Sequence, residues 1–310
     1  MNGIINVIKP MGMSSHQVVA YLRRVLKTRR IGHAGTLDPG AGGLLTICVG
    51  HAAKLMQFMV EYDKAYVAEM TLGLSTSTQD AAGTTESVNV DFQITPNELA
   101  DALAAFRGEI EQIPPMASAV RVEGRRLYEL SREGVTVERK PRRITIHKIH
   151  VNKVWNEYED VLTFGSRVLL YIECSKGTYI RTLCHDVGAK LGIGAHLSFL
   201  SRVRSGPFDL NDGLTLEEIT SRTSRGDLSF VLPMTRALPD WAQVKVNPLA
   251  EQRLRHGNPL LPEDFVDVPR QLQLDEYVFL LDVSGTVLAI GQIRRASGLV
   301  CQPIRVFMEG

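Results

Sequence analysis

The order of the predicted strands and helices constrains the fold of this chain more than any other feature of its sequence. Alternating or apolar runs predict strands over residues 3–10, 65–73, 141–155 and 167–174. Capping residues and helical apolar repeats predict helices over residues 14–26 and 95–110, and a third after the Lys176-Gly177 turn. These elements follow one another without a strict strand–helix–strand rhythm. The sequence therefore favours an α+β fold with a mixed, largely antiparallel sheet over a doubly wound one.

The length of the chain predicts two domains, because 310 residues exceed what one ordinary hydrophobic core holds. The stretch RALPDW, residues 236–241, is typical of a boundary. Beyond it, residues 277–293 form strand-like runs around a Ser-Gly turn. We therefore expect a larger domain over residues 1–240 and a small β-rich domain over residues 241–310.

The cysteines and the apolar segments indicate the compartment. The four cysteines are far apart, with no C-x-x-C pair and no histidine at metal-ligand spacing, so neither a zinc site nor a disulfide framework is supported. The N-terminus has no long apolar signal region, and no run of about 18 apolar residues occurs. We expect a cytoplasmic protein with no membrane partner and no metal.

The net charge of +1 conceals two basic segments. Residues 1–37 carry six Lys and Arg and no acidic residue, and residues 121–153 carry ten Lys and Arg against four Glu. Such clusters are typical of a polyanion partner, because each neutralised phosphate releases condensed counterions. Solvated helix faces would explain a single cluster of this size about as well. Two clusters in one chain favour the polyanion.

The glycine-rich loop GHAGTLDPGAGGLL, residues 32–45, contains Asp38, the first acidic residue of the chain. Pro39 favours an extended conformation at Asp38, and five glycines permit close approach of a ligand or another backbone. Spacing alone leaves open an ordinary Asp-Pro-Gly turn, in which the carboxylate accepts backbone amides. An aspartyl-phosphate phosphatase is excluded, because alignment on GTL puts a glycine and an alanine where its two carboxylates would stand.

Several motifs occur in the order typical of one family, and together they are far more specific than any one alone. They are KPMGMSS (9–15), GHAGTLDPGAGGLLTICVGHAAKL (32–55), KAYVAEMTLG (64–73), IPPMASAV with GRRLYEL (113–130) and CSKGTYIRTLCHDVG (174–188). With them the chain resembles the TruB family of tRNA pseudouridine-55 synthases over most of its first 210 residues.

The resemblance implies an enzyme that isomerises uridine-55 in the T-arm of tRNA to pseudouridine by base flipping. It implies an aspartate-dependent reaction without guide RNA, metal or organic cofactor, in a stand-alone enzyme that we expect to be a monomer. It also implies a pseudouridine-synthase catalytic domain over residues 1–240 with an RNA-gripping thumb inserted at about 116–147. A PUA-like RNA-binding domain would follow over residues 241–310.

The resemblance assigns the central roles to three residues. Asp38 matches the catalytic aspartate, whose carboxylate can act covalently or as a base. Arg181 matches the arginine that pairs with it, which favours the ionised carboxylate and fixes its direction. Tyr66 matches the tyrosine that stacks on the flipped base. On the residues alone, Arg181 could belong to a surface ion pair and Tyr66 could be an ordinary strand aromatic.

Further matches concern the substrate pocket and the RNA backbone. Leu200 matches the leucine that lines the uracil pocket, although an apolar residue in a helix is normally just part of the core. His33 matches the histidine that enters the T-loop beside the displaced base, and a hydrogen-bonded loop histidine is the alternative. Lys9 and Lys64 fit supporting roles, and either could be a generic surface lysine. The thumb cations expected to position RNA phosphates are Arg121, Arg125, Arg126, Arg139, Lys140, Arg142 and Arg143.

Two other functions compete with this interpretation. A non-catalytic RNA-binding module of the same fold is expected to lack the aspartate, arginine or tyrosine, and all three are present. A guide-RNA-dependent relative is the other, but the insertion at 113–130 resembles the stand-alone branch. The sequence departs from the family pattern at Ala53, where threonine is usual, and this does not touch the proposed chemistry. Whether Asp38 attacks the base or the sugar stays open.

Overall fold

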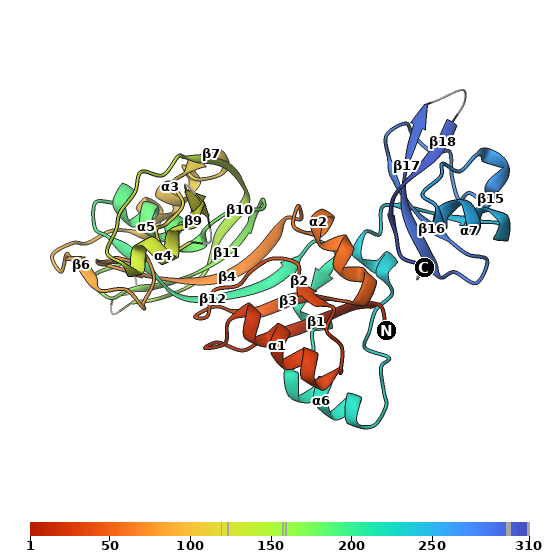
Figure 1. Cartoon of the computed structure of the whole chain (residues 1–310). Helices are drawn as coiled ribbons and strands as arrows, with labels where there is room; N and C mark the ends of the chain where they lie inside the picture. Colours follow the sequence, from red (N-terminus) through yellow and green to blue (C-terminus); the bar gives the residue numbers. More distant parts are fainter. Residues whose placement is uncertain (119, 123, 157, 159, 296–298, 309–310) are drawn as a thin grey trace.

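One large sheet organises most of the chain. The computed structural model describes residues 1–118, 120–122, 124–156, 158, 160–295 and 299–308. Within these ranges nine strands form the sheet, in the order β1-β3-β12-β4-β11-β10-β7, with β2 paired to β3 and β13 to β12 (Figure 1). Their bounds are β1 Gly3–Lys9, β2 Ile31–His33, β3 Gly42–Val49, β4 Lys64–Leu72, β7 Gly108–Gln112, β10 Arg142–Trp155, β11 Arg167–Cys174, β12 Ala195–Ser205 and β13 Phe208–Asp209.

The direction of the strands confirms the expected α+β class. In this described sheet every pairing is antiparallel except that of β12 with β3, so the sheet is mixed and largely antiparallel. The parallel contact joins Ser201 to Gly42 and Arg202 to Gly43. It brings the end of the glycine-rich loop against the middle of β12.

Short helices flank the sheet. The helix α1 begins after Ser14, which closes a capping box with Gln17, and it buries an apolar face. It lies beside α6, where the hydroxyls of Tyr21 and Thr220 are 2.8 Å apart (Figure 1). No helix in the described ranges is long and apolar enough to cross a membrane. The helices are α1 Ser15–Val25, α2 Met56–Met59, α3 Pro96–Ala104, α4 Leu127–Arg132, α5 Ile180–Lys190, α6 Leu216–Ser224 and α7 Pro248–Arg255, with 3₁₀ turns η1 Gly50–Leu55, η2 Leu210–Asp212, η3 Met234–Ala237 and η4 Pro262–Asp264.

The structure corrects one expected helix boundary. The helix predicted over 95–110 ends at Ala104, because Gly108 has a φ of +87° and the residues after it pair with β10 as β7. Residues 142–146 lie on β10, in register with β7. The large sheet thus includes the last residues of the segment expected to form the thumb, about 116–147. Two small hairpins lie outside the large sheet. They are β5 Leu74–Thr76 with β6 Thr85–Val88, and β8 Arg121–Val122 with β9 Arg125–Arg126.

A second sheet follows in the C-terminal part. Its five described strands have the order β15-β14-β16-β17-β18. It packs on the N-terminal part through an aromatic cluster, in which the Trp241 ring centroid lies 4.9 Å from Phe58 and 5.1 Å from Tyr277. One buried apolar core is thus shared by β1, β3 and this sheet. The strands are β14 Ala242–Val246, β15 Phe265–Asp267, β16 Tyr277–Leu281, β17 Val287–Arg295 and β18 Leu299–Val306.

Candidate active site

Asp38 lies in the loop between β2 and β3, and buried contacts fix that loop on both sides of it. Ser15 Oγ accepts a hydrogen bond from the Leu37 N–H (2.9 Å) and donates one to the Leu37 carbonyl (3.0 Å). The Gly12 N–H donates to the Pro39 carbonyl at 2.8 Å. The KPMGMSS motif therefore has a local structural role, because two of its residues hold the neighbours of Asp38.

The guanidinium of Arg181 reaches Asp38 from the first turn of α5. Arg181 Nη2 lies 2.6 Å from Asp38 Oδ2 and donates to the Ala117 carbonyl at 3.0 Å. The Arg181 side chain is 6% exposed and that of Asp38 is 50% exposed. Gln112 on β7 holds the backbone at the start of α5 through two hydrogen bonds of 2.8 and 3.0 Å. A buried, fixed cation therefore faces a carboxylate that is open to a ligand.

Asp80 is a site residue that the sequence reasoning missed. Its Oδ2 lies 3.5 Å from Arg181 Nη1, while its Oδ1 accepts hydrogen bonds from Thr78 Oγ1 (2.6 Å) and the Ala82 N–H (3.0 Å). A bridge to Leu197 on β12 brings this turn to the site. That pairing joins segments far apart in the sequence, so no local motif signals it.

The environment of Asp38 shifts the pKa of its carboxyl group. Desolvation raises the pKa of the Asp38 carboxyl above its ordinary value. The charge of Arg181 opposes this shift, that of Asp80 adds to it, and that of Lys9 opposes it. A carboxylate with a raised pKa is a stronger base and nucleophile once it is ionised.

A cavity of about 290 Å³ opens beside Asp38. It brings together five of the residues expected at the site, which line it from the loop, β4, β12 and α5: Asp38, Lys64, Tyr66, Arg181 and Leu200. Tyr66 is buried on β4, and the burial of Arg181 excludes the alternative of a surface ion pair for that residue. Leu200 is half-buried on the strand β12 rather than in a helix. The cavity thus combines a carboxylate, a cation, an aromatic ring and an aliphatic wall.

Lys9 and Lys64 are buried, so neither is the generic surface lysine that the sequence allowed. Their exposed fractions are 1% and 7%, and each ammonium donates to two backbone carbonyls. Burial lowers the pKa of each to about 8. Lys64 lines the cavity, whereas Lys9 is outside its lining and acts on Asp38 through its charge.

His33 lies on β2, outside the residues that line the cavity. Its ring stands edge-on to His16, with centroids 5.8 Å apart. Burial lowers the pKa of His33 and so favours the neutral imidazole. Among the described residues, no group of three or more His, Cys, Asp and Glu side chains is placed to hold a metal ion.

The expected thumb cations lie on the inserted segment and on β10, away from the cavity lining. Arg125 pairs with Glu133, and Arg139 donates to the Pro114 carbonyl at 3.1 Å. Arg142 and Arg143 are exposed on β10 of the large sheet. Among the described residues of the insertion, Ala117 and Ser118 meet the active site, through the Ala117 carbonyl and the cavity lining. The remaining expected cations of the segment are Arg121 and Arg126 on the β8–β9 hairpin and Lys140 before β10.

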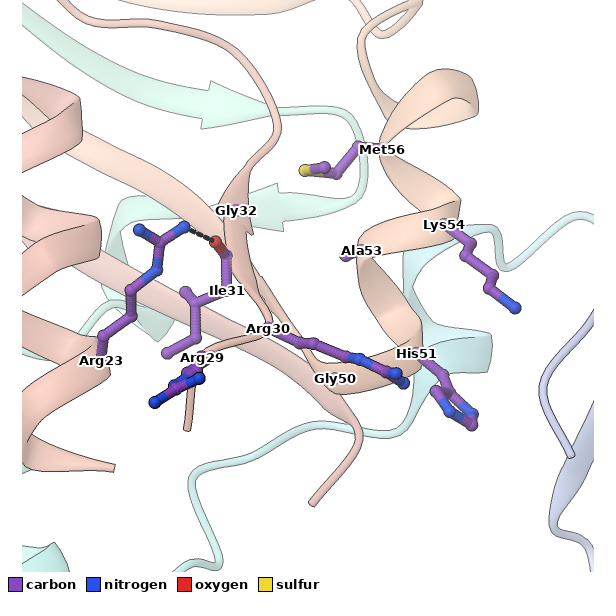
Figure 2. Close-up of a pocket in the computed structure, with 10 residues that line it drawn as sticks. All are labelled: Arg23, Arg29, Arg30, Ile31, Gly32, Gly50, His51, Ala53, Lys54 and Met56. Carbon is purple, nitrogen blue, oxygen red and sulfur yellow. Dashed lines mark hydrogen bonds between the residues drawn. The ribbon is translucent and has the colours of Figure 1, made fainter. Parts of the chain in front are cut away.

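A second cavity, of about 390 Å³, is lined by cations on an apolar floor (Figure 2). Arg23 donates to the Ile31 carbonyl at 2.9 Å, and Arg30 extends across the cavity toward His51. None of the described lining residues is acidic. The lining consists of Arg23, Arg29, Arg30, His51 and Lys54 with Ile31, Gly32, Gly50, Ala53 and Met56.

Comparison with known proteins gives matches over most of the chain. The family model described as "TruB family pseudouridylate synthase (N terminal domain)" matches residues 23–180. The model described as "tRNA pseudouridylate synthase B C-terminal domain" matches residues 181–239. The tRNA pseudouridine synthase B of Symbiobacterium thermophilum is 47% identical over 261 residues, which cover 83% of this chain and 82% of the relative.

Two further proteins are similar over nearly the whole chain. The tRNA pseudouridine synthase B of Pelotomaculum thermopropionicum is 42% identical over 299 residues, covering 95% of this chain and 92% of the relative. A solved chain from a structure titled "Structure of H/ACA RNP bound to a substrate RNA containing 2'-deoxyuridine" has a TM-score of 0.71 and 26% identity. That alignment covers 99% of this chain and 85% of the solved one.

Proposed function

Because the chain belongs to the TruB family of pseudouridylate synthases, we propose that it converts uridine-55 in the T-arm loop of tRNA to pseudouridine. The observation that carries this proposal is the Asp38–Arg181 pair, 2.6 Å apart, beside a cavity lined by Tyr66 and Leu200. A cavity of about 290 Å³ suits one flipped nucleoside. A base inside a folded RNA must leave its stack to reach such a site.

The reaction rearranges one bond within the nucleoside. The bond between C1′ and N1 breaks, the uracil turns, and C1′ is joined to C5. C5 then loses its proton and N1 gains one, so the product is an isomer and no electron acceptor is consumed. Asp38 supplies the nucleophile or the base for these steps. Arg181 directs the carboxylate, and the Tyr66 ring replaces the stacking that the flipped base has lost.

The RNA-binding surface in this proposal extends beyond the cavity. The cations of the inserted thumb contact the phosphates of the T-arm, and the cation-lined second cavity takes a further stretch of RNA backbone. The domain limits proposed are 1–240 for catalysis and 241–310 for a PUA-like RNA-binding domain. The second family match ends at residue 239 and the C-terminal sheet begins at Ala242, which supports this division.

Guide independence is part of the same proposal. Bacterial relatives that align with 83% and 95% of this chain are named as tRNA enzymes, although the solved neighbour comes from a ribonucleoprotein. We therefore expect a monomer that acts on tRNA alone in the cytoplasm.

The test is chemical mapping of pseudouridine in unmodified tRNA after incubation with the protein alone. We expect modification at position 55 by the wild type and none by Asp38→Asn, with tRNA affinity retained. Asp63→Asn is the matched control, because the Asp63 carboxylate is also 50% exposed and lies outside the cavity lining. Modification at another position would refute the site specificity, and activity of Asp38→Asn near that of wild type would refute the mechanism.

A further inference from the structure

Arg202 is a buried charge that the proposed chemistry does not use. It lies on β12 with 1% exposure and belongs to the largest fully buried side chains of the protein. Among the described residues it forms no ion pair with a carboxylate. A buried charge without an opposite charge is strongly unfavourable unless other polar groups compensate for its lost hydration. The compensation therefore shows what holds this side chain in place.

The compensation comes from backbone carbonyls on both sides of Asp38. Arg202 Nε donates to the Leu44 carbonyl at 2.8 Å, and Nη2 donates to the Gly35 carbonyl at 3.2 Å. A weaker contact of 3.4 Å joins Nη1 to the Thr36 carbonyl. One planar guanidinium thus joins the start and the end of the loop that carries Asp38.

The same side chain also lies next to the residue proposed to stack on the base. Arg202 is the register partner of Tyr66 in the pairing of β12 with β4, and it lines the cavity together with Tyr66. On its other side, β12 meets β3 at Gly43. Arg202 therefore connects the stacking ring, the strand that follows the loop, and the loop itself.

Two glycines with positive φ bound the segment that carries Asp38. Gly35 has a φ of +107° and Gly43 a φ of +95°, so the segment between them leaves and re-enters the sheet through backbone conformations that other residues rarely adopt. Ser15 fixes Leu37 from the side of α1, as described above. Arg202, on the strand β12, holds the segment at Gly35 and Leu44.

We propose that Arg202 is a positioning residue, whose guanidinium holds the loop of Asp38 and the Tyr66 ring in the arrangement in which a flipped uridine reacts. This inference rests on the proposed function. It assigns Arg202 an effect on the rate of the chemical step and not on the affinity for RNA, because its contacts are made inside the protein. A misplacement of a reacting group by about 1 Å is enough to lower a rate about 100-fold.

The test compares two substitutions at position 202 with one at position 204. Arg202→Met keeps the volume and removes the contacts, and Arg202→Lys keeps the charge but cannot contact all three carbonyls. Arg204→Met is the matched control, because Arg204 lies on the same strand, pairs with Glu173 at 3.0 Å and does not line the cavity. Each variant is assayed for single-turnover rate at saturating T-arm RNA, for RNA affinity, and for amide hydrogen exchange over residues 35–41.

We expect Arg202→Met to lower the single-turnover rate about 100-fold and Arg202→Lys to lower it less, with affinity within about threefold of wild type. Exchange over residues 35–41 should become faster in Arg202→Met and stay unchanged in Arg204→Met. Rates within threefold of wild type in both position-202 variants would overturn the inference, as would a slower rate with unchanged exchange. If Arg202→Met does not fold, Arg202→Lys decides by the same criteria. An inactive wild type would refute the proposed function, while the exchange measurement still tests the anchoring of the loop.

Discussion

Replacing Arg181 by lysine isolates the part of catalysis that depends on the direction of the carboxylate. The guanidinium contacts Asp38 at 2.6 Å, the Ala117 carbonyl at 3.0 Å and Asp80 at 3.5 Å, and a single ammonium cannot keep all three. Loss of one charge-assisted hydrogen bond costs about 1.5–3 kcal/mol. A misdirected Asp38 carboxylate lowers the rate further, by part of the roughly 100-fold loss that misplacing a reacting group can cause. We take the sum as about 3–4 kcal/mol, which is two to three orders of magnitude in rate.

The measurement is the single-turnover rate at saturating unmodified tRNA, together with the dissociation constant. We expect Arg181→Lys to lower the rate by about 10² to 10³-fold and to leave the affinity within about threefold, because the Arg181 side chain is 6% exposed and its described polar contacts are with Asp38, Asp80 and Ala117. Arg204→Lys, which changes a partly exposed pair with Glu173, is the control and should act like wild type. A rate for Arg181→Lys within tenfold of wild type would refute the role of the planar fork.

Three further predictions concern pH, salt and packing. The single-turnover rate should fall as the pH falls through the raised pKa of Asp38. In Asp80→Asn this fall should occur at lower pH, because removing the negative charge of Asp80 lowers the pKa of Asp38. A pH–rate profile that is unchanged in Asp80→Asn would contradict the effect of Asp80 on Asp38. Neutral substitutions of four cations in the inserted segment and β10 should weaken tRNA binding most at low salt. The slope of log affinity against log salt should fall by roughly 0.7–0.9 for each lost phosphate contact. An unchanged slope would mean that the RNA binds elsewhere. Gly43→Ala should lower the free energy of unfolding by several kcal/mol in a denaturant titration. The reason is that a Cβ at Gly43 would lie 2.4 Å from the Arg202 carbonyl oxygen, at a φ of +95°. Gly40→Ala is the control, because a Cβ at Gly40 would have no atom within 4 Å. The four substituted cations of the salt prediction are Arg139, Lys140, Arg142 and Arg143.

The sequence predicted those parts of the protein that local patterns determine. A cap at Ser14 or Ser15 and the apolar face behind it predicted α1, whose cap is Ser14, and the alternation after Lys64 predicted β4. The family resemblance, which the matches over residues 23–239 confirm, pointed to Asp38, Tyr66 and Arg181, and the structure brings these three together at one cavity.

The remaining features depend on contacts between distant segments. Arg202 and Lys9 are charged residues, which usually lie at the surface, and they are buried here because their strands pair within the sheet. Asp80 lies near Arg181 because its turn forms a bridge to β12, and no motif near Asp80 in the sequence predicts that bridge. The residues after Gly108 continued a helical pattern, but pairing with β10 makes them a strand, so tertiary contact overrode local preference.

The aromatic cluster of Phe58, Trp241 and Tyr277 has a consequence for how the chain unfolds. Phe279 and Phe307 of the C-terminal part are buried in the same core as Ile4 and Leu44 of the first strands. Removing the chain after Trp241 would therefore expose apolar side chains on the remaining part, and we expect such a fragment to self-associate. In the intact protein, we expect the shared core to couple the melting of both sheets into one cooperative transition.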